Sequence, residues 1–183
     1  MTADPYRRLA HRELYRNRWL AVEAHEIVHP TGQPGEHLLV ITPPTCAIVV
    51  EDGDDLVFVR QARFAVRARV IEVVKGGAED GETGPQAAAR ELREELGGTA
   101  RRWSRLGSLY ELPSIVASPV DLYVAHAVAF SQAEPDPNES LEPVRMRAGD
   151  AIAAAAGGEI SDAVTVAALF RYAAANGFLG RRS

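Results

Sequence analysis

Three glutamates lie close together near the middle of the chain. Glu91, Glu94 and Glu95 belong to a run of good helix formers that ends at Gly97. On a helix these carboxylates stand at positions i, i+3 and i+4, so they share one face. Like charges this close repel one another unless a cation lies between them, and a set of oxygen donors selects a hard cation such as Mg²⁺ or Mn²⁺. The spacing therefore predicts a divalent-metal site.

The residues before these glutamates fit the same chemistry. Glu82 precedes the helix and can bend back towards its acidic face, while Arg90 can pair with a carboxylate and fix its orientation. Gly76 and Gly77 allow the backbone to approach a metal or a phosphate closely. Taken alone, the acidic helix is more readily explained as a solvated face with ordinary surface ion pairs. The spacing of all these residues taken together favours the metal site over a solvated face.

The full spacing resembles the signature of a known family, the Nudix hydrolases. Gly76 is followed after five residues by Glu82, and seven further residues lead to Arg-Glu-Leu-Arg-Glu-Glu-Leu-Gly at 90–97. The Nudix box has this pattern and usually ends in an apolar residue, where this chain has Gly98. The segment that enters the box usually carries a proline where this chain has Val74. Neither departure touches a carboxylate, although the second could alter the turn into the metal loop.

Several residues outside the box resemble those found in one branch of that family, the ADP-ribose pyrophosphatases and related ADP-sugar diphosphatases. Trp19 opens a predicted strand, Gln61-Ala62-Arg63 follows the second predicted hairpin, and Pro113 lies fifteen residues beyond Gly98. The resemblance implies Mg²⁺-dependent hydrolysis of the diphosphate linkage of ADP-ribose to AMP and ribose 5-phosphate, with Mn²⁺ as a possible substitute.

The resemblance also implies roles for individual residues. Because a metal-bound carboxylate is a poor base, the general base is expected in a loop outside the box. The predicted metal ligands are Gly76, Glu91, Glu94 and Glu95, the predicted catalytic residues are Glu139, Glu94 and Arg90, and the predicted substrate-binding residues are Trp19, Arg63, Glu72 and Pro113. For three of these the sequence leaves a plainer reading open: Trp19 also suits a core position, Glu139 a solvated loop, and Pro113 a position that only shapes the loop at 111–118.

Strand, turn and helix signals give an outline of the fold. Residues 1–18 are expected to form a loosely attached arm or a short helix, residues 19–42 a hairpin, and residues 46–60 a second hairpin. A helix is expected over 85–96, followed by further strands and by helices at 149–156 and 161–176. By resemblance this is the α/β Nudix fold, an α/β/α sandwich around a mixed sheet. We divide the chain into N-terminal strands at 1–42, expected to build a homodimer, and a hydrolase domain at 43–183.

Composition excludes several other classes of protein. The 183 residues carry a formal net charge of -5, so no overall positive field attracts nucleic acid. Cys46 is the single cysteine, which excludes an intramolecular disulfide, and no apolar run is long enough to span a bilayer. The start of the chain lacks a signal-peptide pattern, so we expect a cytoplasmic protein. The expected partner is a small nucleoside diphosphate substrate.

Two other functions remain open at this point. The same chemistry could act on a different nucleoside diphosphate sugar or on a damaged nucleoside triphosphate. Alternatively the chain could be a nucleotide sensor that binds without hydrolysis. The intact acidic cluster argues against a sensor, because a protein that only binds has little reason to keep three acids that repel one another without a metal.

Overall fold

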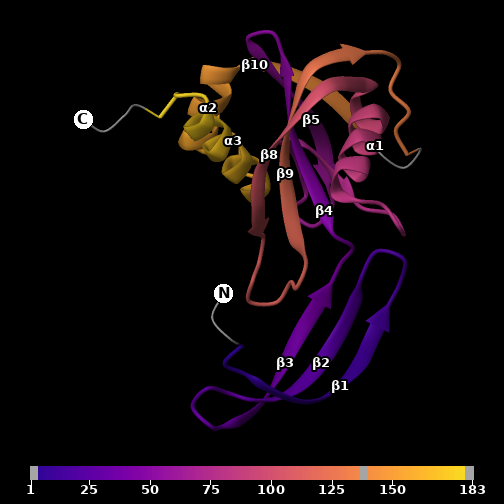
Figure 1. Cartoon of the computed structure of the whole chain (residues 1–183), viewed down its shortest axis with the longest axis vertical. Helices are drawn as coiled ribbons and strands as arrows, with labels where there is room; N and C mark the ends of the chain where they lie inside the picture. Colours follow the sequence, from indigo (N-terminus) through magenta and orange to yellow (C-terminus); the bar gives the residue numbers. More distant parts are fainter. Residues whose placement is uncertain (1–3, 137–139, 180–183) are drawn as a thin grey trace. The chain divides into compact units, whose positions relative to one another are not determined.

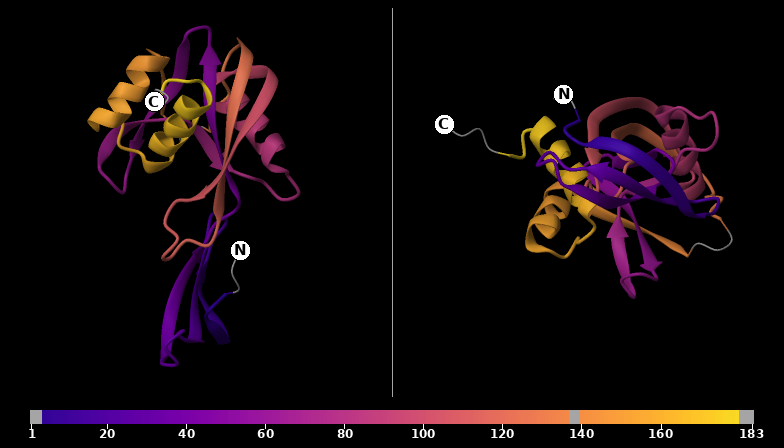
Figure 2. Two further views of the ribbon diagram at one scale, coloured as in Figure 1. Left: turned by 60° about the vertical axis from the view of Figure 1, so that its left-hand side comes forward. Right: turned by 90° about the horizontal axis from the view of Figure 1, so that it is seen from below.

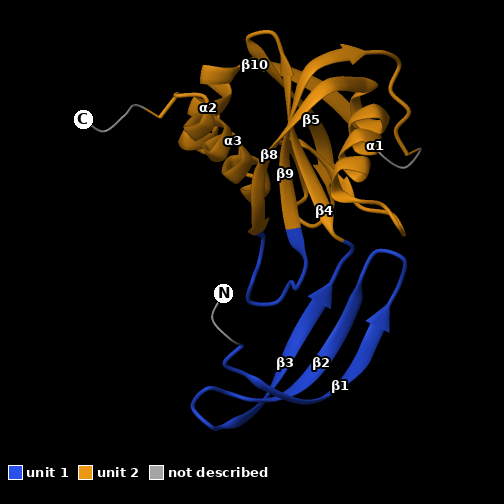
Figure 3. Cartoon of the chain, in the orientation of Figure 1, with its two compact units in different colours: residues 1–43, 110–119 blue, residues 44–109, 120–183 orange. Residues whose placement is uncertain are grey.

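The computed structural model describes residues 4–136 and 140–179, and the chain separates into two compact units (Figure 3). Unit 1 comprises Met1–Pro43 with Tyr110–Pro119, and unit 2 comprises Pro44–Leu109 with Val120–Ser183. Within the described residues no helix is long and apolar enough to cross a membrane.

Unit 1 is built on a three-stranded antiparallel sheet. Its strands β1 (Arg7–Arg16), β2 (Ala21–Val28) and β3 (Pro34–Ile41) are arranged in that order (Figure 1). The predicted hairpin is present as β2 and β3, but the prediction of an arm or helix before it was wrong. β1 pairs with β2 along its length although all ten of its residues are exposed. No residue of this strand is buried, which explains why no alternation of apolar residues marks it.

Unit 2 is a mixed sheet covered by helices on both faces. The central order is β10 (Leu141–Arg147), β5 (Asp55–Arg63), β4 (Thr45–Asp52), β9 (Pro119–Phe130) and β8 (Gly98–Tyr110), with β4 and β9 parallel. Two short strands complete the sheet: β6 (Ala68–Glu72) pairs with β5, and β7 (Val74–Gly77) pairs with β4.

The helices enclose two apolar layers. On one face α1 (Gly84–Leu96) packs through Ala88 and Leu92 against residues such as Ile48 of β4. On the other face α2 (Ala148–Gly157) and α3 (Ala163–Ala175) pack through residues that include Leu169. Figure 2 shows α1 and the α2–α3 pair on opposite sides of the sheet. The α/β architecture with a mixed sheet and three helices confirms the coarse fold prediction.

Local chemistry fixes the ends of α1, and the sequence predicted the proline and the final glycine but not the capping box. Thr83 and Gln86 form a reciprocal capping box at the start, with a proline in the first turn. At the other end Gly97 adopts a left-handed conformation with φ of 64°, and its N–H donates to the carbonyls of Leu92 and Arg93. These end signals set the bounds of α1, so that Glu91, Glu94 and Glu95 all lie on the helix.

Gly98 has a packing reason to replace the usual apolar residue. A Cβ atom at this position would lie 2.7 Å from Cδ1 of Leu92 and 3.1 Å from Cγ1 of Val128. Both side chains therefore occupy the space that a larger residue would need. The departure from the family pattern concerns helix packing and leaves the acidic face unchanged.

Candidate active site

Arg90 is the centre of the acidic cluster. Its Nε donates to Oε1 of Glu82 at 3.0 Å, and its Nη1 donates to Oε1 of Glu91 at 2.7 Å and to Oε2 of Glu94 at 2.9 Å. Nη2 donates to the carbonyl of Gly77 at 2.7 Å. One guanidinium thus joins the loop before α1 to two carboxylates on the helix, as its predicted orienting role requires.

The charges in this cluster stabilise one another. Hydrogen bonds to Glu82, together with those to Glu91 and Glu94, outweigh partial burial and raise the pKa of Arg90. In return, the hydrogen bonds from Arg90 lower the pKa of Glu82. Glu82 also accepts a hydrogen bond from the backbone N–H of Glu79 at 2.8 Å, which folds the loop back on itself. Arg90 and Glu82 therefore form a charged pair at neutral pH.

Gly76 lies directly against Glu91. A Cβ atom at this position would overlap the Glu91 carboxylate, so a residue with a side chain could not occupy it without displacing that group. The Gly76 carbonyl accepts a weak hydrogen bond from Sγ of Cys46 at 3.5 Å. Burial raises the pKa of the Cys46 thiol to about 12, so it stays protonated and is not a nucleophile. The glycine therefore lets the backbone of β7 pass directly beside a helix carboxylate.

A second polar cluster surrounds Glu72, which is only 2 % exposed. Arg63 donates to it from Nε at 3.0 Å and from Nη2 at 2.6 Å, and Nε2 of Gln61 donates at 2.9 Å. The pKa of Arg63 is raised chiefly by the hydrogen bonds to Glu72, and the negative charge of Glu95 adds to this effect. Arg63 and Glu72 were predicted to contact substrate, and the structure brings them together as an ion pair.

Lys75 and Asp162 extend this second cluster and were not predicted from the sequence. Nζ of Lys75 lies 2.7 Å from Oδ1 of Asp162 and 3.4 Å from Oε2 of Glu72. Asp162 is also the N-cap of α3, where it accepts from the backbone N–H of Thr165 at 2.9 Å. The sequence does contain a signal for this helix start, because aspartate is a favoured N-cap residue and its side chain accepts from the backbone N–H three residues later.

The remaining predicted residues lie elsewhere. Trp19 and Pro113 belong to unit 1, whereas the acidic cluster belongs to unit 2. Trp19 is 61 % exposed, which rules out the core position, and the Arg18 guanidinium lies 4.0 Å from the centre of its ring. Glu139 lies outside the described residues.

The donor set suits a divalent cation. Every candidate ligand is an oxygen: the carboxylates of Glu91, Glu94 and Glu95, and the carbonyl of Gly76. Because Gly76 has no Cβ, the backbone at this position lies directly beside the Glu91 carboxylate. In the part of the chain that the structure describes, no three acidic, histidine or cysteine side chains already converge on one point. Arg90 instead holds Glu91 and Glu94 to its own nitrogens.

Comparison with known proteins agrees with this site. The sequence profile of the NUDIX domain matches residues 41–176, which include both polar clusters. The chain belongs to the Nudix family. It is a Nudix hydrolase that resembles ADP-ribose pyrophosphatases, because the ADP-ribose pyrophosphatase of Bacillus subtilis (strain 168) is 25% identical over 164 residues, covering 88% of this chain and 89% of that protein.

Two further relatives are informative. A hydrolase of CMP-5'-(N-acetyl-N-hydroxy-3-aminopropyl)phosphonate from Streptomyces rubellomurinus (strain ATCC 31215) is 30% identical over 115 residues, or 62% of this chain and 56% of that protein. A crystal structure described as an ADP compounds hydrolase superposes with a TM-score of 0.84 at 24% identity and covers 99% of both chains. That structure supports the Nudix fold over the whole chain, including the N-terminal sheet.

Proposed function

We propose that this Nudix hydrolase cleaves the diphosphate linkage of ADP-ribose with Mg²⁺, releasing AMP and ribose 5-phosphate. The observation that carries the proposal is the acidic cluster that Arg90 organises beside Gly76. The Bacillus relative, which acts on ADP-ribose by its name, supports the choice of substrate because the similarity extends over both units.

The cation is held by oxygen donors of the box. We assign this role to Glu91, Glu94, Glu95 and the carbonyl of Gly76, with Mn²⁺ as an alternative to Mg²⁺. When bound, such an ion neutralises diphosphate charge and makes water a better nucleophile at neutral pH. Nudix hydrolases typically use a divalent metal, which agrees with this donor chemistry.

The other residues position these donors and the substrate. Arg90 pairs with Glu91 and Glu94 as well as with Glu82, which limits the positions that these carboxylates can take. Arg63, oriented by two hydrogen bonds to Glu72, retains donors for a substrate phosphate. Glu139 is proposed as the general base that accepts the proton of the attacking water, and Glu94 as a second acid near the reacting phosphate.

The N-terminal strands are proposed to form a homodimer, and Trp19 and Pro113 to contribute to substrate binding from unit 1. The support is that β1 is exposed along its whole length and carries apolar side chains such as Leu14 and Tyr15. We retain 1–42 and 43–183 as the functional division of the chain. Light scattering of the whole protein tests the dimer directly.

One observation favours a second substrate class. The Streptomyces relative carries a cytidine nucleotide in its substrate name and is more similar over the region that it matches. Hydrolysis of another nucleoside diphosphate compound, or of a damaged triphosphate, would use the same acidic cluster. Binding without hydrolysis is the remaining alternative.

Substrate profiling separates these possibilities. Release of nucleoside monophosphate is measured from ADP-ribose, ADP-glucose, GDP-mannose and 8-oxo-dGTP, each with Mg²⁺ and with EDTA. The proposal expects Mg²⁺-dependent release of AMP, with ADP-ribose the best substrate. Preference for another compound would keep the chemistry and reject the substrate, whereas binding without turnover of any compound would reject hydrolysis.

A further inference from the structure

Three polar side chains in unit 2 form a chain of hydrogen bonds that the proposed hydrolysis does not use. Oγ of Ser104 in β8 lies 2.9 Å from Nε2 of His126 in β9, and Nδ1 of the same ring lies 2.5 Å from Oε2 of Glu51 in β4. These strands are neighbours in the sheet, in the order β4, β9 and β8 (Figure 1). A serine, a histidine and a carboxylate joined in this way form the arrangement that activates a serine as a nucleophile.

The direction of these hydrogen bonds fits proton transfer from the serine. The Glu51 carboxylate can only accept, so Nδ1 of His126 carries the hydrogen and donates it. In the neutral ring Nε2 is then an acceptor, and the Ser104 hydroxyl donates to it. The imidazole therefore has the tautomer that can take a proton from Oγ of Ser104 as a general base.

Glu51 is also held from a second side. The hydroxyl of Tyr172 in α3 donates to its Oε1 at 3.0 Å, so each carboxylate oxygen has a partner. The side chains of His126 and Glu51 are only 12% and 22% exposed. Partial burial and two partners restrict rotation of the carboxylate, which in turn fixes the plane of the imidazole ring.

The backbone next to His126 is strained. Ala127 has a φ of 52°, a left-handed conformation that is rare for a residue with a side chain. It reverses the alternation of side chains along β9, because Val124 packs in the layer under α2 and α3 whereas Val128 packs in the layer under α1. Bulges and strained residues of this kind are over-represented beside active sites, where they aim a side chain.

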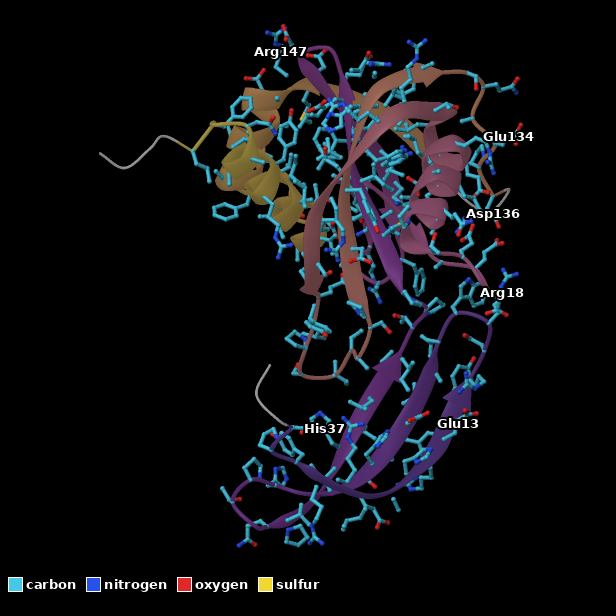
Figure 4. All side chains as sticks on the ribbon, viewed as in Figure 1. Glu13, Arg18, His37, Glu134, Asp136 and Arg147 are labelled. Carbon is cyan, nitrogen blue, oxygen red and sulfur yellow. The ribbon has the colours of Figure 1, made fainter. Side chains whose placement is uncertain are left out.

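The serine end of this chain of hydrogen bonds can be reached from solvent. Side chains fill the layer between α3 and the sheet (Figure 4), but Ser104 is only half-buried and Ala127 is exposed. Beyond α3, the ring of Phe178 lies 6.2 Å from that of Tyr172 and is 48% exposed. An exposed apolar surface beside the hydrogen-bonded residues suits the acyl group of a small ester.

These residues lie on the opposite face of the sheet from the acidic cluster. Glu51 contacts Tyr172 of α3, whereas the acidic cluster is carried by α1, and the two helices cover opposite faces (Figure 2). Activation of a serine by a histidine and a carboxylate needs no divalent cation. The two sets of residues can therefore be tested independently.

We propose that Ser104, His126 and Glu51 form a second catalytic site, which cleaves activated esters of small carboxylic acids through an acyl-serine. Oγ of Ser104 attacks the carbonyl carbon while its proton passes to Nε2 of His126, and that proton then leaves on the alcohol as the ester C–O bond breaks. Water next attacks the acyl-serine and gives a proton to Nε2, which returns it to Oγ as the carboxylic acid is released. Glu51 stabilises the imidazolium in both halves of the reaction.

Incubation of the whole protein in EDTA with p-nitrophenyl acetate tests this proposal, because the good leaving group makes this ester a sensitive probe of an activated serine. We expect release of p-nitrophenolate, with acetylation of the peptide that contains Ser104 seen by mass spectrometry. An alkyl fluorophosphonate should label the same peptide, since attack by Oγ forms an O–P bond and expels fluoride. Ser104→Ala should abolish the label and lower ester cleavage by about tenfold or more.

Two further variants separate catalysis from structure. His126→Gln should lower ester cleavage about a hundredfold, because it removes the general base. Glu51→Gln should lower it about tenfold or more, because an amide nitrogen beside Nδ1 favours the wrong tautomer of the ring. Ser108→Ala is the matched control: Ser108 is on the same strand and exposed, but it donates to Asp121 instead of a histidine, so this variant should react as the wild type does.

Circular dichroism confirms that each variant is folded. A wild-type protein in which Ser104 stays unlabelled would overturn the proposal, as would equal ester cleavage by wild type and folded Ser104→Ala. Either result would leave the proposed ADP-ribose hydrolysis unaffected, because that reaction depends on a divalent cation that EDTA removes.

Discussion

Arg90 and Glu82, eight residues apart in the chain, form a two-point ion pair: Nε donates to Oε1 at 3.0 Å and Nη2 donates to Oε2 at 3.0 Å. The same guanidinium holds Glu91 and Glu94, so the loop and the helix face are fixed by one residue. Planar, bidentate geometry of this kind is specific to arginine, because lysine is a point charge on a flexible stem.

Replacing Arg90 by lysine should therefore impair hydrolysis even though the positive charge is retained. The lysine cannot make parallel bonds to Glu82 while also reaching both helix carboxylates. We expect kcat/KM to fall about 10- to 100-fold at saturating Mg²⁺, as is typical when the partners of metal ligands are removed. Steady-state kinetics over a range of Mg²⁺ concentrations measures the effect.

Arg93→Lys is the matched control for this variant. Arg93 lies on the same helix, but its side chain is half exposed, and its nearest approach to Glu94 is 3.6 Å. An exposed pair of this kind contributes little, so kcat/KM should stay within about twofold of the wild type. Similar losses in both variants would show that Arg90 has no special positioning role.

Gly76→Ala should weaken the response to the divalent cation. The new Cβ would overlap the Glu91 carboxylate, which must then leave its present position. We expect the Mg²⁺ concentration for half-maximal activity to rise about tenfold or more. Gly149→Ala is the control, since a Cβ there meets nothing within 4 Å. An unchanged Mg²⁺ requirement in Gly76→Ala would contradict the proposed ligand set.

The Lys75–Asp162 pair should make the free energy of unfolding depend on pH in the acidic range. Burial raises the pKa of Asp162, but the charge of Lys75 and the hydrogen bonds from Lys75 and Thr165 outweigh it, and the net pKa is lowered. A carboxyl with a lowered folded-state pKa stabilises the protein above its unfolded value and loses this contribution as the pH falls through the folded value. We expect Asp162→Asn to lower the free energy of unfolding by about 1–2 kcal/mol at pH 7.

Urea unfolding between about pH 3 and pH 7 checks this prediction. The difference between wild type and Asp162→Asn should shrink as the solution becomes more acidic. A difference that stays constant over the whole range would show that the charge of Asp162 has no part in the effect.

Tyr172 joins α3 to the sheet. It should give the free energy of unfolding a pH dependence opposite to that of Asp162, with stability lost at high pH. Its hydroxyl donates to Oε1 of Glu51 at 3.0 Å, while Oε2 of Glu51 lies 2.5 Å from Nδ1 of His126. Tyr172→Phe removes one hydrogen bond to a carboxylate, so the free energy of unfolding should fall by about 1–3 kcal/mol. Tyr110→Phe, at a position 58% exposed, should change it by less than about 0.5 kcal/mol.

Burial and the Glu51 charge both raise the pKa of Tyr172. A raised folded-state pKa means that the stabilisation is complete below the ordinary value near 10 and is lost as the pH rises beyond it. Wild-type stability should therefore decline above about pH 10 more steeply than that of Tyr172→Phe. Parallel declines in the two proteins would contradict the assignment.

The sequence was most informative where local chemistry decides the structure. Pro85 and Gly97 at the two ends and the i, i+3, i+4 spacing predicted α1 and its acidic face, because both depend on neighbours within one or two helical turns. The same short separations predicted that Arg90 pairs with a carboxylate and that Glu82 bends back towards the helix, whereas the direct bond between Arg90 and Glu82 was not predicted.

Contacts between distant segments were not predictable in this way. Asp162 meets Lys75 across 87 residues, and Tyr172 meets Glu51 across 121 residues, so only the folded sheet brings them together. Arg63 was predicted from a family landmark, but its pairing with Glu72 depends on the register of β5 and β6. β1 was missed because its pairing involves the backbone, which leaves no pattern in exposed side chains.

Hydrolysis of ADP-ribose should require the ion that we assign to the carboxylates of the box. The most direct test is the rate of AMP release from ADP-ribose with Mg²⁺ by wild type and by Glu95→Gln, with the exposed Glu159→Gln as a control for loss of a surface charge. We predict that Glu159→Gln keeps the wild-type rate and that Glu95→Gln, folded by circular dichroism, loses about a hundredfold or more. Wild-type turnover by folded Glu95→Gln would contradict the account.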